Sequence, residues 1–292
     1  MMTCGFVIIA SPARDSLWSS TANASTTMEG VAGGGETRIV EVDRFNQETF
    51  LSVARRDPME YYFYLLDWLH FNDSTRAFMA MEGGHVEGML LMFMDSLVNI
   101  RAMDRAVEPL LDLVDLDQAE FSVGLNAVKA VESRYEVEMS RTCVLMSLER
   151  GMERLAKRHG TVTLGREDMD EMAALMIRCD PATWGHMDRE RLTKLLGDAD
   201  AVGIRRDTDL ASIAIFRSPD VGGHIGVVAT DQPYRNLGMA TSVVSDAVQR
   251  ILLKVPVVNI NVFEDNLPAR KVYSKLGFGD RSRFQVMRGI IK

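Results

Sequence analysis

Cysteine and histidine are both scarce in this chain of 292 residues, and neither is clustered. The three cysteines, Cys4, Cys143 and Cys179, form no CxxC pair. Their spacing is typical of reduced thiols in an intracellular protein rather than of disulfides or a zinc cluster. The five histidines include no HExxH motif, which a helical zinc site would require. We therefore expect no metal cofactor.

Long apolar runs and a basic excess are also missing. No apolar run reaches the ~18 residues that cross a bilayer. The formal net charge of −8 argues against broad binding to nucleic acid or to an anionic membrane. We therefore expect a cytoplasmic protein that binds neither. The apolar patch at residues 6–10 is shorter than the ~7–15 residues of a signal core, and we interpret residues 1–35 as a disordered tail.

The hydrophobic periodicity of the sequence alternates between that of helices and that of strands. A similar order of helices and strands occurs in each half of the chain. In the first half we expect helices at 46–54, 58–71, 104–114 and 126–134, and strands at 75–81, 86–94, 120–123 and 141–148. In the second half we expect helices at 167–178, 189–196, 239–252 and 269–276, and strands at 161–164, 201–206, 210–216, 224–230, 257–262 and 284–287. The strand pairs of the two halves are offset by roughly 120 residues, which indicates an internal duplication. The alternative is that any two α/β domains share such an order.

The expected fold class is α/β with a mixed sheet, arranged as two tandem domains at residues 36–150 and 151–292. The helix around residues 59–69 is apolar almost all round. Such a helix is usually buried, so we interpret it as core or as a domain interface.

A strand, a turn that contains glycine and a long amphipathic helix follow one another between residues 224 and 252. The first N–H groups of a helix have no intrahelical partner, and the helix dipole adds to their attraction for an anion. Gly238 and Ala240 keep side chains away from this end of the helix, and Arg235 adds positive charge. We interpret the turn as a cradle for a pyrophosphate group. The alternative is an ordinary tight connection between a strand and a helix.

A second motif follows one helix and one strand later. Residues 235–240 read R-x-x-G-x-A, and residues 266–278 read N-x-P-A-R-x-x-Y-x-K-L-G-F. In this order and at this spacing the two motifs resemble the GNAT superfamily of N-acetyltransferases. The resemblance extends from residue 161 to the C-terminus and is firmest over the two motifs.

The resemblance implies acetyl-CoA as co-substrate and a primary amine of a small molecule, peptide or protein as acceptor. It implies that the pantetheine arm pairs with a strand whose neighbour splays away, and that a backbone N–H near Val228 polarises the thioester carbonyl. Tyr273 is then the general acid that protonates the leaving thiolate; packing beside Val272 and Leu276 is the alternative. The residues expected to bind the cofactor are Val228, Ala229, Thr230, Arg235, Asn236, Leu237, Gly238, Met239, Ala240 and Asn266, the last of which could instead cap a helix.

Other roles stay open at this stage. His224 and Glu264 are weak candidates for the general base, and each has a structural alternative. Trp184 is either an acceptor-binding side chain in the loop at 179–186 or a lid on the core. A non-catalytic acyl-CoA sensor or scaffold is the alternative to an enzyme. A homodimer is compatible with the sequence, but no motif demands one.

The first half lacks the features of the cradle. Its corresponding turn, at residues 99–107, contains no glycine, and Asp104 and Glu108 are acids that oppose a phosphate. The segment after it keeps Tyr135 but not the A-R-x-x-Y-x-K-L-G-F run. We predict that this half does not bind coenzyme A. It would be a degenerate copy that packs on the second domain and walls the acceptor site.

Overall fold

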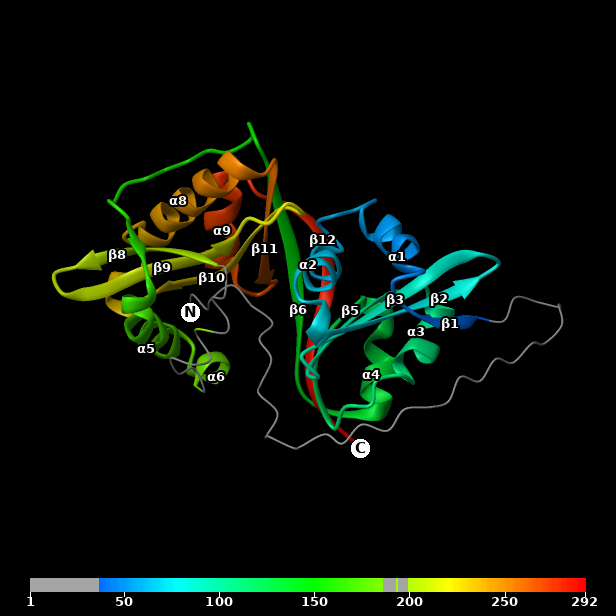
Figure 1. Cartoon of the computed structure of the whole chain (residues 1–292). Helices are drawn as coiled ribbons and strands as arrows, with labels where there is room; N and C mark the ends of the chain where they lie inside the picture. Colours follow the sequence, from blue (N-terminus) through cyan, green and yellow to red (C-terminus); the bar gives the residue numbers. More distant parts are fainter. Residues whose placement is uncertain (1–36, 186–192, 194–198) are drawn as a thin grey trace.

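The computed structural model describes residues 37–185, 193 and 199–292. The tail expected at 1–35 lies outside the described residues, as does the helix expected at 189–196 apart from residue 193. Twelve strands form one mixed sheet in the order β1-β2-β3-β4-β5-β12-β6-β11-β10-β9-β8-β7. The two halves of the chain therefore share a single sheet (Figure 1).

Each half contributes six strands and its own helices. The first half contains β1 (Arg38–Glu41), α1 (Gln47–Ala54), α2 (Tyr62–His70), β2 (Thr75–Glu82), β3 (His85–Phe93), β4 (Leu97–Ala102), α3 (Asp104–Leu111), β5 (Gln118–Val123), α4 (Val128–Arg134) and β6 (Tyr135–Glu149). The second half contains β7 (Val162–Leu164), α5 (Met169–Cys179), α6 (Pro181–Trp184), β8 (Asp200–Arg206), β9 (Asp209–Arg217), β10 (Gly223–Thr230), α8 (Met239–Lys254), β11 (Val257–Phe263), α9 (Leu267–Leu276) and β12 (Gly279–Ile291).

The described elements repeat one order in the two halves: strand, two helices, hairpin, strand, helix, strand, helix, strand. In each half one pair of neighbours is parallel, β4 with β5 and β10 with β11. The expected α/β class, with a mixed sheet and two tandem halves, is confirmed. Strand β4 was not indicated by the sequence, because the polar residues Asn99 and Arg101 interrupt its apolar pattern.

The two halves exchange their last strands. β12 is inserted between β5 and β6 of the first half and is antiparallel to both. β6 in turn lies between β12 and β11 of the second half and is antiparallel to both. These two long strands run side by side through the middle of the molecule (Figure 1). Each half therefore completes its sheet with a strand from the other.

Helices cover both faces of the sheet (Figure 1). In the second half α8 and α9 pack on one face, in a core that includes Val243, Val258 and Tyr273. Helices α5 and α6 pack on the opposite face. In the first half α3 and α4 lie on one face, and α1 and α2 on the other. The buried face of α5 includes Met169, Met172, Ala173 and Met176.

Helix α2 begins later than its sequence indicates. The position of Pro58 predicts a start there, whereas the helix begins at Tyr62. Asp57 Oδ1 accepts the Glu60 N–H at 3.1 Å, so the preceding residues form a turn closed by a side chain. The aromatic start of α2 reaches the second half, where the Tyr62 ring stacks on His224 with a centroid distance of 5.2 Å. The segment at 59–69 is therefore core and domain interface, as predicted.

Candidate functional site

The turn between β10 and α8 has the backbone geometry of an anion cradle. Asn236 has a φ of +64°, and Gly238, which precedes the helix, has a φ of +83°. In the described chain the backbone N–H groups of residues 236–241 have no backbone acceptor, and the first bond back to the turn is Ser242 N–H to Gly238 O at 3.1 Å. Free amides at the start of a sixteen-residue helix favour a phosphate oxygen.

The connector between β6 and β7 adds residues that sequence reasoning missed. Ser242 Oγ accepts the N–H groups of Arg158 at 3.0 Å and His159 at 3.3 Å. His159 Nε2 donates to Leu237 O at 2.8 Å, and its Nδ1 accepts from Arg206 Nη2 at 2.7 Å. Two arginines are thereby held beside the cradle. The basic run that contains Arg158 and His159 is the signal that could have pointed to them.

Arg235 is held at the end of β10. Its Nε donates to Thr230 O at 3.1 Å, so the guanidinium folds back toward the strand. The Cys179 thiol lies beside it, and burial raises the pKa of this thiol despite the hydrogen bond from Arg235. Arg235, the cation predicted to lie beside the phosphates, is therefore positioned where β10 meets the cradle.

Strands β10 and β11 run together only at their beginnings. The register pairs residues 223–225 with 258–260. Beyond this point β10 continues to Thr230 against β9, and β11 continues to Phe263 against β6. A register shift against β9 between Ile225 and Val227 marks the point of divergence. Val228, Ala229 and Thr230 thus have no described partner on the β11 side, which is the opening that the resemblance implies for a pantetheine arm.

Tyr273 lies on α9, and Asn266 is the residue directly before this helix. Tyr273 is 2% exposed and shares a core cluster with Val228, and its ring lies 6.0 Å from Phe278. Asn266 Oδ1 accepts the Ala269 N–H at 3.3 Å. Asn266 therefore caps the helix, which is the alternative that the sequence left open.

The weaker candidates, His224, Glu264 and Trp184, lie outside the cradle itself. His224 is near the start of β10, its Nδ1 contacts Asn259 Oδ1, and burial lowers its pKa to about 4. Glu264 Oε1 pairs with Arg283 Nε at 2.7 Å on the surface. Trp184 is 2% exposed and belongs to the core under α5. It is therefore a core residue and not an exposed side chain of the loop.

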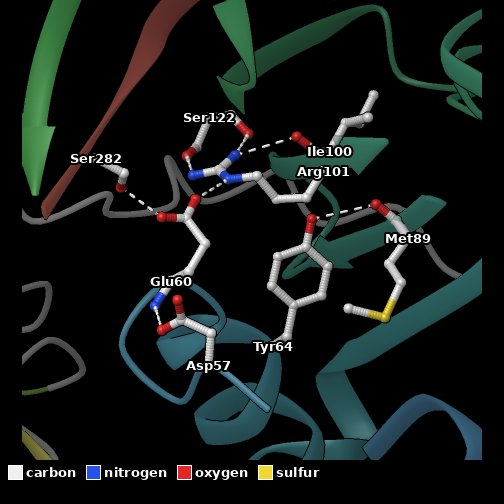
Figure 2. A network of polar contacts seen from close by, with 8 residues as sticks. All are labelled: Asp57, Glu60, Tyr64, Met89, Ile100, Arg101, Ser122 and Ser282. Carbon is white, nitrogen blue, oxygen red and sulfur yellow. Dashed lines mark hydrogen bonds and ion pairs between the residues drawn. The ribbon is translucent and has the colours of Figure 1, made fainter. Parts of the chain in front are cut away.

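At the equivalent position of the first half, Arg101 bridges β4 and β5. After Ile100 and Val123 the register of β4 with β5 ends. The Arg101 Nη1 donates to the carbonyls of Ile100 at 3.1 Å and Ser122 at 2.9 Å, and its Nε pairs with Glu60 Oε1 at 2.7 Å. Figure 2 shows this guanidinium bridging the two strands, with Ser282 of β12 bonded to Glu60.

The turn from β4 to α3 differs from the cradle in its backbone as well. Met103, which precedes α3, has an extended conformation with φ −65° and ψ 152°, whereas Gly238 is left-handed. Tyr135 begins β6 instead of lying in a helix, and its hydroxyl donates to Leu116 O at 3.0 Å. It is therefore not the counterpart of Tyr273.

Within the described residues, no three or more His, Cys, Asp or Glu side chains gather as a metal site. No described helix is long and apolar enough to cross a membrane.

Comparisons with known proteins agree with this geometry. Residues 201–286 match the family model described as FR47-like protein. No curated protein matches the chain. A putative acetyltransferase of the GNAT family from Novosphingobium aromaticivorans is 19% identical with a TM-score of 0.51, over 70% of this chain and 88% of its own. A GCN5-related N-acetyltransferase from Sphaerobacter thermophilus is 13% identical with a TM-score of 0.58, over 86% and 95%.

A tandem arrangement is also found among solved structures. A tandem GNAT protein from the clavulanic acid biosynthesis pathway is 15% identical with a TM-score of 0.53, over 87% of this chain and 98% of its own. At such identities the likeness concerns the fold. Residues 201–286 are therefore similar to the FR47-like family, and the described chain has a fold like that of solved GNAT acetyltransferases, including a tandem GNAT protein.

Proposed function

We propose that this protein is an N-acetyltransferase that transfers an acetyl group from acetyl-CoA to a primary amine in a ternary complex. The observation that carries the proposal is the separation of β10 from β11 directly before the cradle at Gly238. One strand thus offers unpaired backbone for an extended arm, and the turn after it offers free amides for a diphosphate. We assign this site to the domain at residues 151–292, with the domain at 36–150 as its degenerate partner.

The cofactor-side roles follow from the charges and amides of the site. The N–H groups of residues 236–240 would bind the pyrophosphate, and Arg158, Arg206 and Arg235 would balance its charge. The backbone from Val228 to Thr230 would pair with the pantetheine arm. The N–H near Val228 would donate to the thioester oxygen as negative charge develops on it.

The transfer requires the amine to react as a neutral nucleophile. Its nitrogen attacks the thioester carbon, and the C–N bond forms as the carbonyl π electrons move to the oxygen. When the carbonyl reforms, the C–S bond breaks and its electron pair leaves with sulfur. The nitrogen releases one proton to water, and the thiolate takes one from the Tyr273 hydroxyl, which solvent then restores. The products are an N-substituted acetamide and coenzyme A.

Calorimetric titration with acetyl-CoA, followed by thiol-release assays over a panel of amines, tests the proposal. Saturable binding with thiol release on one class of amine is the expected result. Binding without turnover would favour the alternative of an acyl-CoA sensor or scaffold, and absence of binding would refute the site.

Tyr273→Phe tests the assignment of the general acid. We expect turnover to fall by ~10²–10⁴-fold because the leaving thiolate loses its proton donor. The acetyl-CoA dissociation constant should not change, since the hydroxyl is not assigned to the phosphate cradle. Unchanged turnover in this variant would assign Tyr273 to packing.

A further inference from the structure

Side chains from both halves of the chain meet where the start of α2 reaches β10. The Tyr62 ring stacks on the His224 ring at 5.2 Å with an interplanar angle of 30°, and the Phe63 ring meets it edge-on at 5.3 Å. Tyr62 is 2% exposed, and His224 and Asn261 are each 5% exposed. Asn261 lies on β11 just beyond Ile260, the last residue of β11 that pairs with β10. The cluster therefore borders the opening between the two strands.

The hydrogen bonds of this cluster determine which ring nitrogen of His224 is free. Asn259 Nδ2 donates to Met59 Sδ at 3.5 Å, which orients the amide so that its Oδ1 faces His224 Nδ1. An amide oxygen only accepts, so Nδ1 carries the proton and Nε2 is left with a lone pair. The ring is neutral, since burial lowers the pKa of His224 to about 4.

Three polar atoms of the cluster are buried without a hydrogen-bond partner in the part of the chain that the structure describes. They are Tyr62 Oη, His224 Nε2 and Asn261 Oδ1. A buried polar atom without a partner destabilises a fold, so such atoms call for an explanation. Two of the three only accept hydrogen bonds, and the hydroxyl can do so as well. A ligand group that could satisfy all three atoms is a hydrogen-bond donor with several N–H bonds.

Two ionisable groups lie near the cluster. Arg217 on β9 is close enough to Tyr62 and His224 to affect the pKa values of both. Asp67 on α2 is buried, and its burial raises its pKa while the charge of Arg217 lowers it. The His224 ring and the Asn261 amide offer neutral acceptor atoms. Neutral acceptors in a buried position suit an uncharged amine, which is the nucleophilic form, because a buried ammonium would need an opposite charge beside it.

We propose that the amino group of the acceptor binds, uncharged, at the junction of the two halves, where it donates to His224 Nε2 and Asn261 Oδ1 and contacts the Tyr62 hydroxyl. This inference rests on the proposed function and adds to it a residue of the first half. The first half then contributes directly to the acceptor site of the second. His224 orients the amine and does not take its proton, in keeping with a ring that stays neutral.

Tyr62→Phe and Tyr64→Phe form a matched pair of variants on α2. Both tyrosines are buried, but the Tyr64 hydroxyl donates to Met89 O at 3.2 Å within the first half. We expect Tyr62→Phe to raise the KM for the amine about tenfold, and to leave the melting temperature equal or higher because a buried polar atom without a partner is removed. Tyr64→Phe should instead lower the melting temperature and leave the amine KM unchanged. The reverse pattern would overturn the proposal.

A second measurement does not depend on turnover. Ethanolamine, glycinamide and benzylamine are each titrated into the full-length protein loaded with coenzyme A and labelled with ¹⁵N-histidine. We expect at least one of these amines to shift the ring-nitrogen resonances of His224, with weaker binding in Tyr62→Phe. If acetyl-CoA binds but none of the three shifts His224, the placement of the acceptor is wrong. If acetyl-CoA does not bind, the proposed function itself fails, and this inference fails with it.

Discussion

At Gly238 the backbone conformation decides what the side chain can be. The φ of +83° lies in the left-handed region, while a Cβ there would meet only Arg158 Cδ at an ordinary 3.7 Å. An alanine at this position would therefore be disfavoured because of the left-handed backbone conformation and not because of steric contacts. The left-handed conformation costs a non-glycine residue roughly 1–2 kcal/mol. Gly238→Ala should weaken acetyl-CoA binding by roughly 5- to 30-fold in calorimetric titration, because the loop leaves the conformation that aligns its amides.

Gly279 offers a control for this substitution, because it has no left-handed φ and no atom lies within 4 Å of a Cβ built there. Gly279→Ala should leave the acetyl-CoA dissociation constant unchanged. Equal affinities for the wild-type protein and both variants would show that the turn does not bind the pyrophosphate.

Between the elements β4 and β5, Arg101 forms a bridge at the position equivalent to the one where β10 and β11 of the second half run apart. The side chains of Arg101 and Glu60 are 13% and 20% exposed, and the guanidinium also bonds to β5 and lies 5.0 Å from the Phe284 ring of β12. Arg101→Ala leaves the Glu60 carboxylate without its cation in a poorly solvated position. We expect the free energy of unfolding, measured by urea denaturation, to fall by about 3 kcal/mol.

Arg76 provides the comparison. It also pairs with a carboxylate, Asp115, and lies 5.6 Å from a phenylalanine ring, but the two side chains of its pair are 46% and 66% exposed. Arg76→Ala should cost less than about 1 kcal/mol. If Arg101→Ala costs no more than Arg76→Ala, the Arg101 bridge does not hold the first half together.

For the whole molecule, the exchange of β6 and β12 links the stability of the two halves. A fragment of residues 37–150 would lack β11 and β12, so β5 would lose its antiparallel partner β12, and β6 would lose both of its neighbours. We expect this fragment to be unfolded by circular dichroism, and the intact chain to unfold in a single transition. Coexpression with residues 151–292 should restore a folded complex. A fragment that unfolds cooperatively by itself would contradict this view.

Much of the site could be predicted because it depends on residues close together in the chain. The turn from Arg235 to Ala240 and the motif from Asn266 to Phe278 each occupy one local strand–helix or helix–turn unit. Gly238 and Gly277 both adopt the left-handed φ that their places beside a helix suggest. The contribution of Arg158, His159 and Arg206 could not be predicted, because His159 and Leu237 are 78 positions apart and meet only after folding.

The sequence by itself determined most of the elements, the repeated order of the halves and the glycine turn before α8, since each is set by hydrophobic period, glycine and helix ends over a few turns. Only the tertiary structure decided the exchange of β6 and β12, the burial of Trp184, the bridging of β4 and β5 by Arg101 and the contact of Tyr62 with His224. These features depend on which strand edges and faces meet. Pairing between distant segments is selected by the burial and hydrogen bonding of the whole sheet, and no local pattern encodes it.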